Sequence, residues 1–263
     1  MNRFRALRIG IIDHETAREE TVSPSMTRIT ENASHEPLQY MALAVLSLGA
    51  AGATGILSLS YSTIFQPYFG NMHPLLALAV ITLVGVVSLS FLRVRGWFEI
   101  YTRRHSLRGV VLAATLATLF ALVVIVVDRS IGFPRDLNVP LPQSLLFYPA
   151  MAYVVESALH AFPLALFLVV LGPLFQHRNP TSLVWLGMLL VSLLEPILPM
   201  GLGTSAQPFS WLAVYVGLHV FAFNLVQMYV FRRYDFVAMS ALRLVYYLHW
   251  HIVWGYVRLQ VLF

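Results

Sequence analysis

The chain has 263 residues, of which 58% are hydrophobic and 11% are charged. A soluble domain carries about 25% charged residues, so the composition excludes a soluble globular protein and predicts a polytopic membrane protein. The absence of cysteine excludes disulfides, thiolate catalysis and cysteine metal sites. All 17 basic residues are arginine, and the net charge of +5 calls for no nucleic-acid partner, because membrane topology places arginines in loops.

Residues 1–38 are polar and mixed in charge, and we expect them to form a disordered cytoplasmic tail. Seven apolar stretches follow, each near the ~20 residues that a helix needs to cross a bilayer. They lie near residues 39–63, 74–92, 109–128, 144–175, 181–200, 209–231 and 236–260. The sequence therefore predicts an all-α membrane bundle of about seven transmembrane helices.

The fourth stretch, residues 144–175, is too long for a straight crossing. Pro149, Pro163 and Pro173 interrupt it, so we expect a kinked or partly re-entrant helix. If the stretch splits into two crossings, the number of spans rises to eight.

Arginine placement predicts the orientation in the membrane. With seven spans and the N-terminus inside, 13 arginines lie inside and three, Arg129, Arg135 and Arg258, lie outside. This distribution follows the positive-inside rule. We therefore expect a protein of the bacterial inner membrane with a cytoplasmic N-terminus.

Ionisable groups divide the membrane part of the chain into residues 39–143, the first three spans, and residues 144–263. The first three spans hold no ionisable side chain at mid-span, and Asp128 stands at a span end. The mid-span ionisable residues all come later: Glu156, His160, Glu195, His219, Arg243, His249 and His251. A charge at the bilayer centre costs at least ~2.5–3.5 kcal/mol, so these residues are candidates for a catalytic or binding site.

The two mid-span glutamates stand in different local settings. Glu156 and His160 are four residues apart and therefore share one helix face. Glu195 precedes Pro196, which disfavours helical geometry and frees the carbonyl of Ser192. A locally opened helix beside an acid is a common way to build an ion or substrate site in a membrane. The alternative is a protonated glutamate that is hydrogen-bonded to a neighbouring span.

The two histidines of the last span point in nearly opposite directions, because they are two residues apart on a helix. His251 shares its sector with Arg243 and Tyr247, and we expect it, rather than His249, to face the site. Gly255, one turn on, lets a neighbouring helix approach closely. Arg243 is always charged and is expected to neutralise one of the glutamates.

A glutamate that activates water, with histidines that orient it or bind a metal, hydrolyses amide bonds. The candidate ligands for a divalent metal such as zinc are Glu195, His160 and His251. His219 has a structural or a functional role. Asn224 and Gln227 are expected to bridge helices.

Residues 155–160, Val-Glu-Ser-Ala-Leu-His, resemble a motif of the CPBP family of intramembrane proteases, which comprises CAAX prenyl proteases and bacteriocin-processing enzymes. The motif is EExxxR. In this match Glu156 takes the place of the second glutamate, Val155 replaces the first, and His160 replaces the arginine.

Two further motifs of that family match in order along the chain. FxxxH falls on residues 191–195, with Glu195 in place of the histidine, which is similar to a sister group that cleaves anti-sigma factors. HxxxN falls on residues 249–253 or 251–255, and neither has the asparagine. The resemblance covers residues 144–258.

The resemblance implies an intramembrane endopeptidase in which Glu156 is the general base. Glu195, His160 and His251 or His249 would then orient water or bind a metal. The partners would be membrane lipid and a membrane-embedded or lipidated peptide, cleaved in or near the membrane. Because Val155 replaces the first glutamate of the motif, a catalytically inactive scaffold that only binds a membrane peptide remains an alternative.

Other functions remain open from the sequence. Residues 203–206 resemble the GxSG motif of rhomboid proteases, with Ser205 as the nucleophile. Buried glutamates and histidines also form proton relays in coupled transporters. Histidine pairs on facing spans bind haem.

Overall fold

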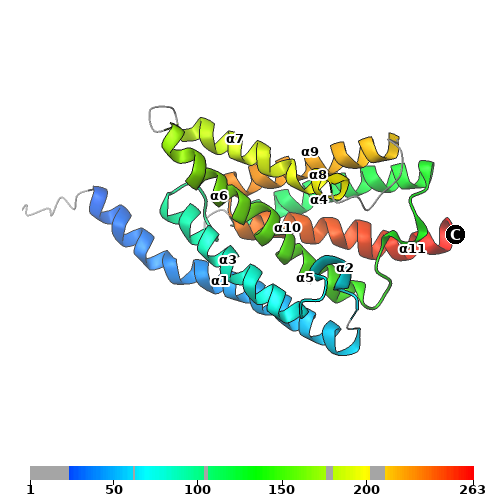
Figure 1. Ribbon diagram of the computed structural model, residues 1–263. Helices are drawn as coiled ribbons and strands as arrows, with labels where there is room; N and C mark the ends of the chain where they lie inside the picture. Colours follow the sequence, from blue (N-terminus) through cyan, green and yellow to red (C-terminus); the bar gives the residue numbers. More distant parts are fainter. Residues whose placement is uncertain (1–23, 62, 104–105, 176–179, 202–210) are drawn as a thin grey trace, which may run out of the picture. The chain divides into compact units, whose positions relative to one another are not determined.

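The computed structural model describes residues 24–61, 63–103, 106–175, 180–201 and 211–263. The chain forms two units, Met1–Glu36 and Pro37–Phe263. The first unit is described from Pro24 onward and is helical there. The second unit is a bundle of helices, and the described residues contain no β-strand (Figure 1).

Six helical stretches of the described chain are long and apolar enough to cross a membrane. Three are single helices: α3 (Pro74–Val94), α4 (Ser106–Ile131) and α9 (Trp211–Arg233). A fourth is Pro37–Ser60, which belongs to α1 (Pro24–Ser60). These stretches confirm the prediction of a polytopic all-α membrane bundle.

The other two spans are each built from three consecutive helical segments. Ser144–Leu171 consists of α5 (Ser144–Val155), the π-helical η2 (Glu156–Ala161) and α6 (Phe162–Leu171). Phe236–Val261 consists of α10 (Phe236–Tyr247), the π-helical η4 (Leu248–Trp254) and α11 (Gly255–Val261). Helix continues through Pro149 and Pro163, so the first of these stretches is one span and does not split into two crossings.

The predicted fifth span, residues 181–200, is a shorter apolar helix, Thr181–Ile197. It runs through α7 (Pro180–Ser192) and α8 (Leu194–Gly201), which are separated at Leu193. The remaining short elements are α2 (Gln66–Phe69), η1 (Arg135–Leu137) and η3 (Gly172–Phe175).

Helix α1 begins at Pro24, within the stretch expected to be a disordered tail. Proline is well suited to the first position of a helix, where its missing N–H would be unpaired in any case. The expectation of disorder for residues 1–23 lies outside the described residues.

Among the described residues of the second unit, the buried apolar side chains form two clusters. Helix α10 packs against α4, α5 and α9. Side chains on the outer faces, among them Leu48, Leu59 and Leu107, are exposed. Exposed leucines along apolar helices fit faces that meet lipid. Residues on both sides of position 143 belong to the same compact unit, Pro37–Phe263.

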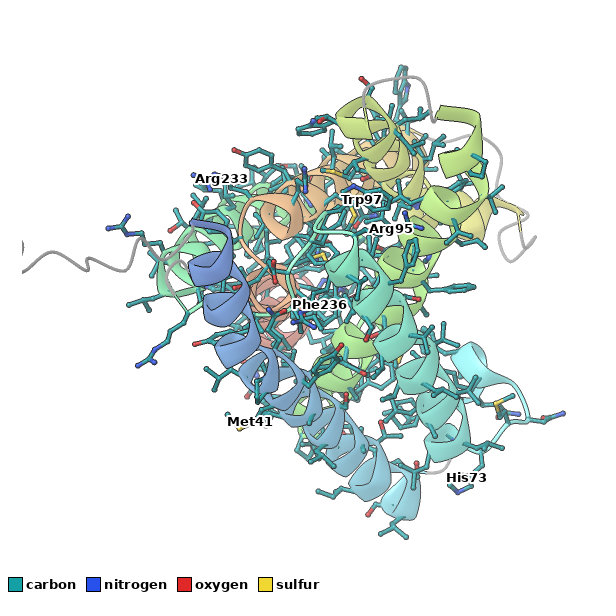
Figure 2. The ribbon with its side chains drawn as sticks, turned by 90° about the vertical axis from the view of Figure 1, so that its left-hand side faces the viewer. Met41, His73, Arg95, Trp97, Arg233 and Phe236 are labelled. Carbon is teal, nitrogen blue, oxygen red and sulfur yellow. The ribbon has the colours of Figure 1, made fainter. Side chains whose placement is uncertain are left out.

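Two arginine-bearing connections meet at one end of the bundle. Figure 2 shows Arg95 and Trp97, which follow α3, on the same side as Arg233 at the end of α9. The Arg232 guanidinium donates to the carbonyl of Trp97. The backbone N–H of Phe236 donates to the carbonyl of Glu99 at 3.0 Å. Both arginine clusters thus lie at the same end, as the positive-inside rule requires of loops on one side of a membrane.

Gly109 marks a close approach between α4 and the turn before α10. A Cβ atom added there would lie 2.9 Å from Cγ of Tyr234. We expect Gly109→Ala to lower the free energy of unfolding by about 1–3 kcal/mol, because the ring must shift in a packed interior. Thermal unfolding in detergent measures this. Gly217→Ala is the matched control, since nothing lies within 4 Å of an added Cβ there, and an equal loss in both variants would contradict the prediction.

Candidate active site in the membrane

Arg243 on α10 joins the two mid-span glutamates. Its Nε donates to Oε1 of Glu156 at 2.6 Å. Its Nη1 and Nη2 donate to the two carboxylate oxygens of Glu195 at 3.2 and 2.9 Å. The expectation was that Arg243 neutralises one glutamate, and the structure pairs it with both.

Polar side chains of α9 and α10 also accept hydrogen bonds from Arg243, and the N–H groups of Nη2 are shared among three acceptors. Nη2 donates to Oδ1 of Asn224 at 3.1 Å and to Oε1 of Gln227 at 2.7 Å. Nη1 donates to the hydroxyl of Tyr247 at 3.1 Å. Gln227 in turn donates to Oε1 of Glu156. Asn224 and Gln227 therefore bridge helices, as expected.

His160 lies beside Glu156, with Nδ1 3.3 Å from the second carboxylate oxygen, Oε2. Both side chains are fully buried. Two carboxylates against one guanidinium leave a single negative charge in the cluster.

Both π-helical segments carry predicted site residues. Glu156 and His160 stand in η2, and His249 and His251 stand in η4. In η2 the wider turn brings Nδ1 of His160 within 3.4 Å of the carbonyl of Val155, five residues earlier. Single π-helical turns inside α-helices occur frequently at functional sites.

The break between α7 and α8 places Glu195 in the first turn of α8. The carbonyl of Ser192, which Pro196 was expected to leave without a helical partner, accepts from Nδ2 of Asn224 at 3.4 Å. The side chain of Glu195 is 25% exposed, whereas that of Glu156 is 0% exposed. Of the two glutamates, Glu195 is therefore the one accessible from outside the cluster.

Glu195 opens onto a cavity of about 250 Å³. The charged and hydroxyl-bearing side chains and histidines that line it come from α8, α9, α10 and η4: Glu195, Tyr215, His219, Arg243, Tyr246, Tyr247 and His251. Neither Glu156 nor His160 lines the cavity. Its wall is otherwise apolar and aromatic, which is typical of a pocket for an organic ligand.

His251 lines this cavity and His249 does not. The His251 ring stacks on Tyr148, with ring centroids 4.5 Å apart. Its Nδ1 lies 2.6 Å from Oδ1 of Asn138. Nδ1 of His249 instead donates to the carbonyl of Val245 at 2.8 Å, within its own helix.

His219 also lines the cavity and bonds to two tyrosines. Its Nε2 is 3.2 Å from the hydroxyl of Tyr246, and its Nδ1 is 3.5 Å from the hydroxyl of Tyr215. These contacts hold the ring at the cavity wall.

Asp128 and Arg258 form a second buried ion pair, which the sequence analysis did not predict. Arg258 was counted among the arginines on the outer side of the membrane, and the structure shows that its side chain is fully buried against Asp128. Its Nε donates to Oδ2 of Asp128 at 2.8 Å, and Trp254 Nε1 donates to the same oxygen at 2.7 Å. The available signal was that Asp128 is the only acid within the first three predicted spans.

The proposed metal ligands His160, Glu195 and His251 do not gather into one site. Among the described residues, no group of three or more histidine, aspartate or glutamate side chains could hold a metal ion. Ser205, the nucleophile of the rhomboid-like alternative, lies outside the described residues.

No protein-family model, curated protein or solved structure matches the chain.

Proposed function

We propose that the protein is a divergent intramembrane endopeptidase of CPBP type, in which Glu195 activates the attacking water. The observation that carries the proposal is that Glu195 lines the cavity, whereas Glu156 is sealed behind Arg243. A general base must reach the water that it deprotonates. This proposal moves the role of general base from Glu156 to Glu195.

The chemistry requires no group beyond those at the cavity wall. Glu195 accepts a proton from water, and the water oxygen attacks the carbonyl carbon of a peptide bond. The C–N bond then breaks, and the proton passes from Glu195 to the leaving nitrogen. Arg243 holds the carboxylate in place with two hydrogen bonds, and geometry of this kind supplies much of the rate enhancement in enzymes.

Tyr247 is placed to support the reacting carbonyl. Its hydroxyl oxygen accepts from Nη1 of Arg243, so its own proton remains to be donated. Hydrogen-bond donors directed at the developing negative charge stabilise the tetrahedral intermediate. The substrate would be a membrane-embedded or lipidated peptide, since the cavity is formed by membrane-spanning helices.

Comparison of protein termini in host membranes tests the proposal. Membranes with the wild-type protein, Glu195→Gln or the control His249→Gln are profiled by mass spectrometry for processed termini. We expect a terminus that is present with wild type and His249→Gln and reduced at least ~100-fold with Glu195→Gln, the usual scale of a lost general base. Normal abundance of Glu195→Gln is required, and a terminus that persists undiminished in this variant would overturn the proposal.

A second function is favoured by one contact. The guanidinium of Arg243 donates to both oxygens of Glu195, and such pairing weakens a carboxylate as a base. A catalytically inactive protein that binds a membrane peptide in the cavity would show this pairing. Native mass spectrometry of the purified protein would then find an intact peptide bound, and processed termini would be the same with and without the protein.

A further inference from the structure

The connection between α4 and α5 carries Asn138 into the membrane bundle. Its start is fixed by the buried ion pair, because Arg258 donates to the carbonyls of Phe133 and Pro134 at 2.7 and 2.8 Å. The N–H of Phe133 donates to Asp128 at 2.7 Å. These hydrogen bonds hold the start of the connection in place.

Asn138 forms a hydrogen bond with His251, the histidine that lines the cavity. Its Oδ1 lies 2.6 Å from Nδ1 of His251, a residue 113 positions later in the chain. An amide oxygen only accepts hydrogen bonds, so this contact favours the tautomer of His251 with the proton on Nδ1. The lone pair of a neutral ring is then on Nε2, and the tautomer is set by this contact.

Tyr148 of α5 contacts both His251 and the chain next to Asn138. Its ring stacks on His251 with an interplanar angle of 18°. Its hydroxyl accepts from the backbone N–H of Val139 at 2.9 Å, which fixes the chain next to Asn138. The imidazole is thus restrained both in its plane and in its rotation.

Gly255 provides the space for Asn138. A Cβ atom added at this position would lie 3.0–3.2 Å from Nδ2, Cβ and Cγ of Asn138, which are its three nearest atoms. Gly255 has ordinary helical φ and ψ angles of −52° and −36°, so its backbone does not require glycine. The glycine is required by the approach of Asn138, one turn after His251.

We propose that Asn138 is a positioning residue that holds His251 in the tautomer with the proton on Nδ1, so that Nε2 serves the reaction in the cavity. The role in catalysis rests on the proposed peptidase function. The control of the tautomer does not rest on it and can be measured separately.

The first measurement is the ¹⁵N spectrum of histidine-labelled protein in detergent micelles, which distinguishes the two neutral tautomers. The His251 signal is identified by its loss in His251→Gln among the nine histidines. We expect Asn138→Ala to move this signal away from the Nδ1–H tautomer. Asn71→Ala is the matched control in another connection and should leave the signal unchanged.

The second measurement is the cleavage rate of the peptide whose terminus depends on Glu195. We expect Asn138→Ala to lower kcat by about 10–100-fold with little change in KM, the usual effect of removing an orienting partner. The double variant Asn138→Gly with Gly255→Asn moves the amide to the helix turn after His251. It should restore both the tautomer and most of kcat, which a merely structural role of Asn138 would not predict.

The two readouts separate the two proposals. An unchanged His251 signal in folded Asn138→Ala would overturn the positioning role, even if the wild type cleaves peptides. A changed signal in a protein that processes no terminus would support the positioning role and reject the peptidase.

Discussion

Replacement of Arg243 by methionine is expected to lower the free energy of unfolding by about 3–5 kcal/mol, because it leaves buried carboxylates without their counter-charge. Arg243 donates to Glu156, Glu195, Asn224, Gln227 and Tyr247. Methionine fills a similar volume but supplies no donor. Glu156 would remain fully buried with its charge unpaired.

Thermal unfolding in detergent, followed by circular dichroism, measures this effect. A loss of that size lowers the midpoint by roughly 10 °C for a chain of this length. Arg233→Met is the control, because Arg233 lies in the last turn of the neighbouring helix α9 and is exposed. A triple variant that combines Arg243→Met with Glu156→Gln and Glu195→Gln should recover much of the stability. If Arg243→Met alone unfolds like the wild type, the cluster does not hold the bundle together.

Replacement of Asp128 by asparagine is expected to lower the free energy of unfolding by a similar amount, about 3–5 kcal/mol, because it leaves a buried charge without its partner. Asparagine keeps the shape of the side chain but removes the charge that compensates the fully buried Arg258. The guanidinium also holds the carbonyls of Phe133 and Pro134, so we expect the connection that carries Asn138 to loosen.

The unfolding midpoint of Asp128→Asn is compared with that of Arg129→Gln, a substitution at the exposed neighbouring position. Limited proteolysis within residues 132–143 gives an independent readout. Faster cutting there in Asp128→Asn, and not in Arg129→Gln, would show that the ion pair fixes the connection. Equal midpoints and equal cutting in both variants would contradict this prediction.

Hydropathy alone was enough to predict the all-α membrane bundle. Apolar stretches of about 20 residues have one common solution in a bilayer, since a helix satisfies its own backbone hydrogen bonds. The pairing of Arg243 with glutamate also followed from the sequence, because a buried guanidinium requires a counter-charge and Glu156 and Glu195 are the only mid-span acids. The α-helical period showed only that His249 and His251 point in different directions.

The tertiary structure alone decided which glutamate is accessible. Hydropathy reports how deep Glu156 and Glu195 lie along their helices but not how those helices are rotated against α10. The π-helical turns at η2 and η4 make side-chain directions still harder to predict from the sequence. An extra residue in a turn changes the direction of every side chain after it.

Local sequence patterns could not predict contacts between residues that are far apart in the chain. Asp128 and Arg258 are 130 positions apart, and Asn138 and His251 are 113 positions apart. Asn138 stands in a proline-rich connection where no periodicity indicates a direction for its side chain. The sequence thus determined the membrane bundle and the charged groups that must be compensated within it, whereas the packing of its helices decided which of them meet and which reach the cavity.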